Sequence, residues 1–487
     1  MQEGLTYDDI LIVPNYSEVL PTETNLETKF SRNIPLKIPI SSSPMDTVTE
    51  HQMAIALALE GGIGIIHKNL SPKEQADEVK KVKRFENGFI KEPLTVGPDE
   101  TIEKVHQIYQ DLGYKKIPVV NEKNILLGII TEFYYDWPKD KDTKVAKLMK
   151  PINELIVAKD GITLKNANQI IKKEKLAVLC IVDKNGKLRS IVTHKDLEKN
   201  REYPNANKDS GKSLLVGAAI STGDEMFERA LLLEKAGVDV IVVDTAHGHS
   251  KNVIDMVKKI KTNKTFQNVD VVAGNVATKE AVKDLANAGA DGIKVGIGPG
   301  SICTTRIIAG IGVPQITALM ESVKGLPKNN PPSIIADGGI SYSGDIVKAI
   351  AVGADCVMLG GLLAGSEEAP GETLFINGRM FKSYRGMGSL SAMKAGSKDR
   401  YGQGKVKEVN KFVPEGIEGR IPYRGPVNKN IYQLIGGLRS GMGYIGAENI
   451  KELKQKVKII KMTGAGQNES HPHNIIITED APNYKRK

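Results

Sequence analysis

The sequence predicts an α/β protein built on a (β/α)8 TIM barrel, and two regularities of the chain support this prediction. Eight short apolar runs recur along it, and segments with the apolar spacing of amphipathic helices follow many of them. The apolar runs are continuous rather than alternating, which is typical of parallel strands that are buried on both faces. Eight such strands alternating with helices fit a closed barrel better than an open doubly wound sheet, which is the alternative.

The elements of this predicted barrel follow one another in a regular order. The expected strands are residues 38–42, 62–67, 214–220, 238–244, 269–273, 292–296, 333–336 and 356–359. The expected helices are residues 224–236, 250–261, 278–288 and 343–351. Three of the helices start with Ser or Thr, and these side chains are good caps for helix N-termini because their oxygens accept hydrogen bonds from free backbone N–H groups.

An insertion separates the second and third predicted strands, and it contains an internal repeat. Residues 120–124 align with residues 182–186, and residues 128–131 align with residues 190–193, both at an offset of 62. The two copies resemble a tandem pair of CBS modules, a family that often binds adenine or guanine nucleotides. A packing module that serves only dimerisation is the alternative.

The two copies differ at the position where such modules often bind ribose. The second copy keeps a Thr-x-x-Asp ending at residues 193–196, whereas the first copy reads Thr-Glu-Phe-Tyr at residues 131–134. This departure weakens the prediction of a nucleotide site in the first copy. We expect a tandem CBS domain at residues 91–205, with ATP or GTP as candidate ligands, and a barrel formed by residues 1–90 and 206–487.

The composition favours a soluble cytoplasmic protein. The 67 Lys and Arg residues against 58 Asp and Glu residues give a net charge of +9, but the lysines are spread out, which favours a solvated basic surface over a nucleic-acid groove. Three cysteines cannot form a disulfide framework, which suggests a reducing compartment. We see neither a signal peptide nor an uncharged apolar run of the ~18 residues that a membrane span needs.

A glycine-rich loop with a cysteine follows the sixth predicted strand. Residues 295–306 read Val-Gly-Ile-Gly-Pro-Gly-Ser-Ile-Cys-Thr-Thr-Arg, and this loop falls at the rim where barrels of this class carry their active sites. The glycines allow the backbone to approach a ligand closely. Cys303, with Arg306 nearby, is therefore a candidate activated thiolate. The alternative is a small, inert apolar residue.

The next two strands end in glycines that indicate phosphate binding. Asp337-Gly-Gly ends the seventh strand and Gly360-Gly361 ends the eighth, which is where barrels often bind phosphate through backbone N–H groups. Asp337 can accept hydrogen bonds from ribose hydroxyls. A structural Asp-Gly turn is the alternative. After the last strand, residues 382–425 hold many Gly, Lys and Arg residues, and we expect an active-site flap there.

Four segments together resemble the inosine monophosphate (IMP) dehydrogenase family. They are the Cys303 loop, Asp337-Gly-Gly, Tyr384-Arg-Gly-Met-Gly388 and the Ser-Pro-Met-Asp-Thr-Val-Thr-Glu of residues 43–50. The resemblance runs essentially from Leu5 to Tyr484. The nearest competitor is guanosine monophosphate (GMP) reductase, which shares the barrel and the cysteine loop but usually lacks the CBS pair and the dehydrogenase-type flap. Here the flap carries Asp-Arg-Tyr at residues 399–401 and Pro-Glu-Gly at residues 414–416, which favours the dehydrogenase.

The resemblance implies NAD-dependent oxidation of IMP to xanthosine monophosphate (XMP), the committed step of guanine nucleotide synthesis. Cys303 would attack purine C2, a hydride would pass to NAD⁺, and the resulting thioimidate would be hydrolysed. Arg400, with Tyr401 beside it, would be the base that activates water, and Thr305 with Glu415 offers another proton route. An ordinary arginine is a poor base because its pKa exceeds about 12. A cation that steers phosphate is therefore the alternative role of Arg400.

The resemblance also implies binding residues, a bound cation and an assembly. The substrate would be held by Ser43, Met45, Ser301, Asp337, Gly338, Gly339, Gly360, Gly361, Tyr384, Arg385, Gly386, Met387, Gly388 and Glu415. The dinucleotide would lie near Asp244, Asn275, Gly296, Ile297 and Gly298. A potassium ion would be bound by carbonyls of Gly298, Gly300 and Cys303, with Glu469, Ser470 and His471 from a neighbouring subunit of a homotetramer.

Many members of the family have Ser where this chain has Gly361, so one hydroxyl contact to phosphate is missing here. His471 and His473 have no third ligand at zinc spacing, and we reject a zinc site.

Overall fold

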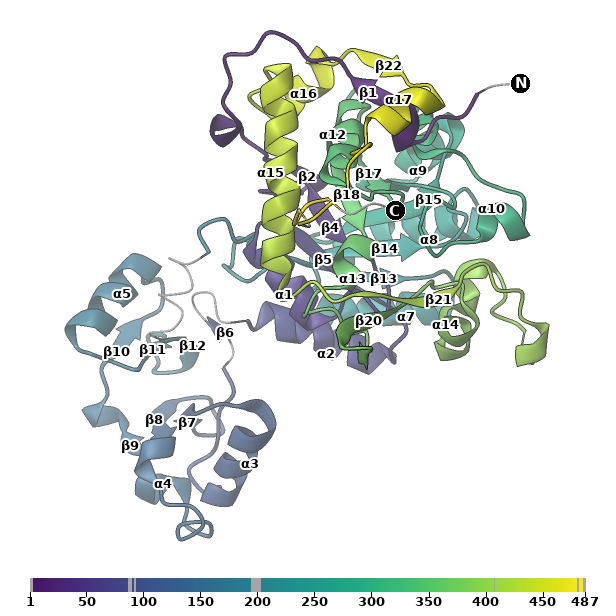
Figure 1. Ribbon diagram of the computed structural model, residues 1–487. Helices are drawn as coiled ribbons and strands as arrows, with labels where there is room; N and C mark the ends of the chain where they lie inside the picture. Colours follow the sequence, from purple (N-terminus) through teal and green to yellow (C-terminus); the bar gives the residue numbers. More distant parts are fainter. Residues whose placement is uncertain are drawn as a thin grey trace. The chain divides into compact units, whose positions relative to one another are not determined.

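The computed structural model describes residues 3–85, 90–91, 93–193, 203–406, 408–479 and 481–484. The chain forms two compact units. The first, which we call the barrel unit, consists of Met1–Lys83, Asn205–Lys208 and Leu214–Lys487. The second, which we call the inserted unit, consists of Arg84–Pro204 and Asp209–Ser213. Figure 1 shows both units along the chain.

Eight parallel strands form a closed barrel in the barrel unit. They are β4 (Ile40–Ser42), β5 (Ile63–Ile66), β13 (Val216–Ile220), β14 (Val240–Asp244), β15 (Asp270–Val276), β16 (Gly292–Val295), β17 (Ser333–Asp337) and β18 (Cys356–Leu359). The barrel closes because β18 pairs with β4 and β5 pairs with β13. Closure excludes the open doubly wound sheet, and each predicted strand is present within a few residues of its expected bounds.

Helices surround this barrel, and the four that the sequence predicts begin and end within one residue of their expected bounds. They are α7 (Asp224–Lys235), α8 (Lys251–Thr262), α9 (Lys279–Asn287) and α12 (Ser343–Ala351). Thr278 caps α9, because its hydroxyl accepts a hydrogen bond from the Ala281 N–H at 3.3 Å. The other helices of this unit are α1 (His51–Leu59), α2 (Pro72–Lys83), α10 (Thr305–Ile308), α11 (Gln315–Val323), α13 (Gly361–Ala364), α14 (Leu390–Ala395), α15 (Val427–Ile445), α16 (Ile450–Lys456) and α17 (Gly464–Glu469).

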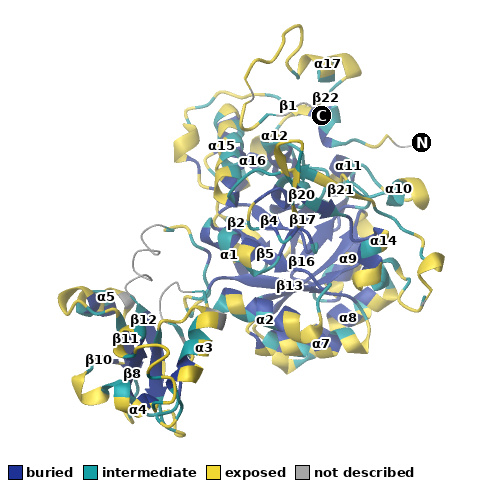
Figure 2. Cartoon of the chain, turned by 60° about the horizontal axis from the view of Figure 1, so that its bottom comes forward, coloured by how far each residue is buried: buried dark blue, intermediate teal, exposed yellow. Residues whose placement is uncertain are grey.

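Aliphatic side chains from the strands fill the barrel interior. In Figure 2 the barrel strands carry the dark blue of buried residues. Ile65, Val242 and Ile335 are among the fully buried members of this core. A hairpin of β2 (Thr28–Ser31) and β3 (Ile34–Leu36) adds Phe30 and Leu36 to the same core. The continuous apolar strands are thus explained by burial on both faces, toward the interior and toward the helices.

The predicted flap contains more regular structure than the sequence indicates. β19 (Thr373–Ile376), β20 (Arg379–Arg385) and β21 (Glu418–Pro422) form an antiparallel sheet, and α14 and a 3-10 turn at Ser397–Tyr401 lie between β20 and β21. Charged and exposed residues interrupt these strands, so they lack the continuous apolar pattern of the barrel strands. A short sheet of β1 (Ile10–Ile12) and β22 (Ile459–Lys461) joins the two ends of the unit.

The inserted unit shows the internal repeat as two similar sets of elements. β7 (Lys116–Val120), β8 (Leu126–Thr131) and β9 (Lys150–Pro151) form one sheet, and β10 (Val157–Lys159), β11 (Val178–Val182), β12 (Leu188–Thr193) and β6 (Ile90–Lys91) form the other. Its helices are α3 (Ile102–Leu112), α4 (Val145–Leu148) and α5 (Leu164–Lys173). α5, β11 and β12 each begin 62 residues after α3, β7 and β8, which is the offset of the sequence repeat.

The predicted ribose-binding endings of the two repeats can be compared with the structure only in part. In the first copy, Thr131 accepts a hydrogen bond from the Phe133 N–H at 3.4 Å and caps a turn at Glu132–Tyr134. In the second copy, residues 194–196 of the predicted ribose-binding ending lie outside the described residues. No helix among the described residues is long and apolar enough to span a membrane.

Candidate active site

A cavity of about 1570 Å³ lies at the end of the barrel where the parallel strands have their carboxyl ends. This volume exceeds the ~300–1,000 Å³ of ordinary small-molecule sites. Many predicted site residues line it. They are Ser43, Met45, Asp244, Asn275, Gly296, Gly298, Gly300, Ser301, Cys303, Asp337, Gly338, Gly339, Gly360, Gly361, Tyr384, Gly386, Met387, Gly388, Arg400, Tyr401 and Glu415.

Cys303 begins a short chain of polar groups at this cavity. Its thiol lies 3.2 Å from the Thr305 hydroxyl, and that hydroxyl donates to a Glu415 carboxylate oxygen at 2.8 Å. Cys303 is partly exposed, whereas Cys180 and Cys356 are buried. Burial raises the pKa of the Cys180 thiol to about 12 and raises that of Cys356 well above its ordinary value. An accessible cysteine linked to a carboxylate fits a nucleophile better than it fits a packing residue.

The base of the flap holds the cysteine loop by backbone hydrogen bonds. The Thr304 N–H donates to the Glu415 carbonyl at 3.0 Å, and the Ile417 N–H donates to the Ile302 carbonyl at 3.0 Å. This pairing brings Glu415 to Thr305 across 110 residues of sequence. Gly388 has no room for a side chain, because a Cβ there would lie 2.8 Å from Cζ of Tyr401.

Arg400 is held as a cation by Asp244. The two side chains form an ion pair. Burial by itself would lower the pKa of Arg400, but the Asp244 charge outweighs burial and raises that pKa above its ordinary value. Burial would likewise raise the pKa of Asp244, yet Arg400 and Lys294 lower it to about 2. To act as a general base, Arg400 would first have to lose its proton, which requires a lowered pKa. The ion pair with Asp244 raises this pKa, so it does not provide the setting that the predicted base requires.

Further contacts fix the flap on the barrel rim. The buried Lys68 forms an ion pair with Asp399, and the Ala246 N–H donates to the Arg400 carbonyl at 3.0 Å. Both contacts involve residues close in sequence to the Arg400–Asp244 pair: Asp399 precedes Arg400, and Ala246 follows Asp244 by two positions. The flap therefore covers Asp244, a residue predicted to lie near the dinucleotide.

Asp337 is oriented by two buried groups below the predicted ribose site. Lys294 lies 2.6 Å from one of its carboxylate oxygens, and the Asn275 amide donates to the same oxygen at 2.8 Å. Gly338 and Gly339 follow with φ values of 92° and 81°, a left-handed conformation that favours glycine. Lys294 was not among the predicted site residues. A single lysine inside a continuous apolar strand was the signal that could have found it.

Several predicted residues do not reach the cavity. The Arg385 guanidinium is turned to Asp46, at distances of 2.7–3.2 Å, and to Ser391, so its side chain does not line the predicted substrate site. The Ile297 carbonyl accepts from Arg306 at 3.1 Å, and Ile297 is not a lining residue. Glu469 ends α17, Ser470 and His471 follow it, and His471 contacts Tyr484 at 3.0 Å. These three residues are expected to act from a neighbouring subunit, so their role stays a prediction.

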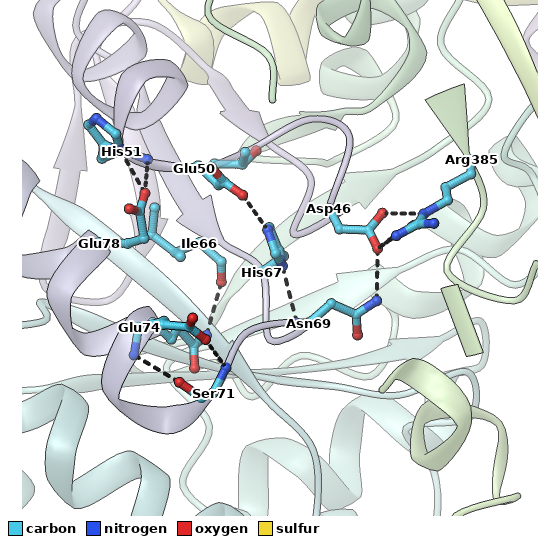
Figure 3. Close-up of polar contacts among 12 residues, drawn as sticks. Asp46, Glu50, His51, Ile66, His67, Asn69, Ser71, Glu74, Glu78 and Arg385 are labelled. Atoms are coloured by element: carbon cyan, nitrogen blue, oxygen red, sulfur yellow. Dashed lines mark hydrogen bonds and ion pairs between the residues drawn. The ribbon is translucent and has the colours of Figure 1, made fainter. Parts of the chain in front are cut away.

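The segment at residues 43–50 contributes support as well as lining residues. Figure 3 shows Asp46 between Arg385 and the Asn69 amide, which donates to it at 2.8 Å. In the same view, Glu50 contacts His67 at 3.1 Å. The acidic residues of this motif therefore tie the loops after β4 and β5 to β20, while Ser43 and Met45 face the cavity.

A closed parallel barrel whose rim carries an accessible cysteine, glycine-rich strand ends and a flap defines a TIM-barrel enzyme with a cysteine loop at its cavity. The model of the IMP dehydrogenase / GMP reductase domain matches residues 4–473. The chain therefore belongs to this family, and the resemblance seen in the sequence is confirmed.

Curated relatives match the chain over nearly its whole length. Inosine-5′-monophosphate dehydrogenase of Aquifex aeolicus (strain VF5) is 56% identical over 487 residues, which covers 99% of this chain and 98% of the relative. The enzyme of the same name from Bacillus subtilis (strain 168) is 50% identical over 485 residues, again covering 99% of this chain and 98% of the relative.

A solved structure also matches, and it corrects one argument from the sequence. GMP reductase of Trypanosoma brucei in complex with guanosine 5′-monophosphate has a TM-score of 0.90 and 42% identity, covering 98% of this chain and 99% of that chain. A reductase can therefore be as long as this chain, inserted unit included. The insertion does not separate the two activities, and the distinction depends on sequence similarity and on the flap.

Proposed function

We propose that this protein catalyses the NAD-dependent oxidation of IMP to XMP. The observation that carries the proposal is the identity of 50–56% to proteins named inosine-5′-monophosphate dehydrogenase, over 99% of this chain. The chain of Cys303, Thr305 and Glu415 at the cavity supports it. GMP reductase is the second candidate, because a reductase structure matches the whole fold with a TM-score of 0.90.

In the first chemical step, Cys303 adds to C2 of the bound purine. The backbone of Gly338 and Gly339 and of the neighbouring strand end would hold the phosphate, and Asp337 would accept hydrogen bonds from the ribose. The thiol proton can pass through the Thr305 hydroxyl to Glu415, which leaves a thiolate to form the C–S bond. NAD⁺, when bound, accepts the hydride that leaves C2.

In the second step, after Glu415 has released the thiol proton to solvent, water adds to C2 and gives a proton to Glu415. That proton is returned to the sulfur, which leaves C2 as the Cys303 thiol. The Thr305–Glu415 pair is the proton route that the geometry favours, because the hydroxyl and carboxylate are in contact beside Cys303. Arg400, whose pKa is raised by Asp244, acts instead as a cation that keeps the flap closed.

The residues near Asp244 fit a dinucleotide. Its carboxylate is buried, ionised and at the cavity wall, where it can accept hydrogen bonds from ribose hydroxyls. Asn275 and Gly298 line the same region. Since Arg400 occupies Asp244 here, the dinucleotide would bind after the flap has moved away.

A potassium ion would be bound by backbone carbonyls of the cysteine loop. The Cys303 N–H donates to the Gly300 carbonyl at 3.1 Å, and this turn keeps the carbonyl-bearing backbone between the two residues compact. Gly298 has a φ of 75°, which lets the loop reverse direction. Glu469, Ser470 and His471 from a second copy would complete the site in a homotetramer.

One experiment separates the two candidate reactions. The purified protein is incubated with IMP and NAD⁺, and in parallel with GMP and NADPH, while the absorbance of reduced nicotinamide is followed and the purine products are separated by chromatography. A rise in absorbance with formation of XMP supports the dehydrogenase. Consumption of NADPH with release of ammonia from GMP, and no XMP from IMP, would overturn it.

Substitution of Gly361 by serine is expected to tighten substrate binding. A Cβ at this position would lie 3.5 Å from the Ser301 hydroxyl and 3.6 Å from the Tyr384 ring, which is ordinary contact, so the space for a serine exists. A new hydroxyl that donates to the phosphate should lower the KM for IMP about three- to tenfold with little change in kcat. Steady-state kinetics of Gly361→Ser and Gly361→Ala test this, and equal KM values for both variants would contradict it.

The inserted unit is proposed as a tandem CBS domain that binds an adenine or guanine nucleotide. Its two sets of elements repeat at an offset of 62, as the sequence pattern requires. Each proposed catalytic group lies in the barrel unit. The unit therefore serves regulation and not the reaction itself.

Removal of the inserted unit is expected to leave catalysis intact. With residues 91–203 replaced by a short Gly/Ser linker, kcat should stay within about threefold, because an inserted domain with its own core can be lost without damage to its host. Asn207 is retained, since its buried amide donates to the Pro35 carbonyl at 2.7 Å. Any response to ATP or GTP should vanish. A truncated protein that fails to fold would show that the insertion completes the barrel core.

A further inference from the structure

Lys294 is a fully buried lysine at the centre of the site. Its side chain is 1% exposed, and it comes from β16, inside an otherwise apolar strand. Its Nζ lies 2.8 Å from a carboxylate oxygen of Asp244 and 2.6 Å from one of Asp337. It thus bridges two carboxylates from different strands, β14 and β17. The reaction proposed above gives this lysine no chemical task.

The two carboxylates belong to different parts of the proposed site. Asp337 is the predicted ligand of the substrate ribose, and Asp244 faces the proposed dinucleotide region and Arg400. With the flap seated, Arg400 and Lys294 together balance the two negative charges. When Arg400 leaves Asp244, Lys294 is the cation that still contacts both carboxylates. A buried carboxylate without a partner is costly, so this contact keeps both in place.

We propose that Lys294 is a positioning residue that links the substrate and dinucleotide sites, by holding Asp337 and Asp244 on one ammonium group while the flap moves. The inference rests on the proposed function. It predicts that loss of the lysine weakens the binding of both IMP and NAD⁺, although the two ligands are bound by different residues. A residue that served only one site would affect one ligand.

The charge of Lys294 should also set how dinucleotide binding depends on pH. Asp244 is faced by Lys294 from β16, by Arg400 and Tyr401 from the flap, and by Lys68 after β5. Burial acts to raise the pKa of Asp244, while Arg400 and Lys294 lower it. Without Lys294 and with the flap open, this pKa should rise. The affinity for NAD⁺ should then fall as the pH is lowered, because a protonated Asp244 accepts fewer hydrogen bonds from ribose.

Three substitutions of this lysine separate its charge from its packing. Lys294→Met keeps the length and removes the charge, Lys294→Gln keeps a donor without the charge, and Lys294→Arg keeps the charge. Lys261→Met is the matched control. It removes the partner of another buried carboxylate, Asp291, which precedes the same strand at the opposite end of the barrel.

The measurements are the Kd of IMP by calorimetry without NAD⁺, the KM of NAD⁺, and the pH profile of that KM. We expect Lys294→Met to raise both constants at least about tenfold, because truncation of one partner of a buried charge pair is strongly unfavourable. Lys294→Arg should keep the Kd of IMP and the KM of NAD⁺ close to those of the unmodified protein. In Lys294→Gln, the KM of NAD⁺ should depend on pH more strongly than in the unmodified protein. Lys261→Met should change neither constant. Thermal unfolding checks that each variant is folded, and Lys294→Arg and Lys294→Gln carry the test if Lys294→Met is not.

Two results would overturn the inference. One is that folded Lys294→Met or Lys294→Gln keeps both constants within about threefold of the unmodified protein. The other is that only one of the two constants changes. A failure of the proposed function would look different, because the unmodified protein itself would then form no NADH from IMP. Calorimetry of the variants would still show whether Lys294 affects ligand binding through Asp244 and Asp337.

Discussion

Replacement of Cys303 by alanine should abolish NADH formation while IMP still binds. The thiol is the one accessible cysteine sulfur among those described, and the proposed phosphate and ribose contacts come from other residues. We expect kcat to fall by a factor on the order of 10⁴ or more, as in other enzymes that lose their nucleophile. The Kd of IMP, measured by calorimetry, should change little. Cys180→Ala, in the inserted unit, is the control and should retain turnover.

The same prediction can be checked on the unmodified protein by trapping the covalent intermediate. Mass spectrometry after denaturation with IMP and NAD⁺ should find the nucleotide on the peptide that contains Cys303. An adduct on Cys180 or Cys356 would refute the assignment, as would full turnover by Cys303→Ala.

Arg400→Ala should separate the two chemical steps. The first step needs Cys303 and the dinucleotide in place, whereas the second needs the flap seated on Asp244. We expect a burst of about one equivalent of NADH per active site, followed by turnover about 10²–10³ times slower than normal. Rapid-mixing measurements of absorbance give the burst amplitude, and the later linear phase gives the slow rate. Tyr401→Phe should show the same pattern more weakly.

The control for this variant is Arg379→Ala, an exposed arginine on β20 outside the cavity, which should behave as the unmodified protein. Loss of the burst itself in Arg400→Ala would assign Arg400 to substrate binding or to the redox step. Glu415→Gln supplies a further comparison. If Glu415 takes the thiol proton as well as the water proton, that variant should slow the burst and the linear phase together.

The barrel was predictable from sequence because burial on both faces leaves a continuous apolar pattern in each strand, as in β14 and β15. β20 and β21 were not predicted as strands, since exposed and charged residues interrupt any continuous apolar pattern in them. The pattern of apolar residues therefore predicts which strands are buried better than it predicts which strands pair. Pairing on an exposed sheet depends on partners that are distant in the chain.

The same physical limit applies to the site. Motifs within one loop, such as Cys303 and Thr305, could be read directly, and the structure brings them together. The contact of Lys294 with two carboxylates could not be predicted from sequence. Asp244 and Asp337 lie on other strands, and the contact exists only after the barrel closes. The contact between Arg385 and Asp46 could not be predicted for a related reason. The local motif shows the position of Arg385 on the flap but not the distant carboxylate that its side chain contacts.

The order of strands in the barrel has a consequence for synthesis of the chain. β4 pairs with β18, so the pairing Ser41–Met358 joins residues that are far apart in the chain. The barrel cannot close until β18 has left the ribosome, and β5 must wait for β13 across the whole insertion. The inserted unit is almost continuous in sequence and has its own core, so it can fold while β4 and β5, paired with each other, still lack their outer neighbours β18 and β13. During that interval β4 and β5 expose apolar edges, and this nascent species is the one that should depend most on chaperones.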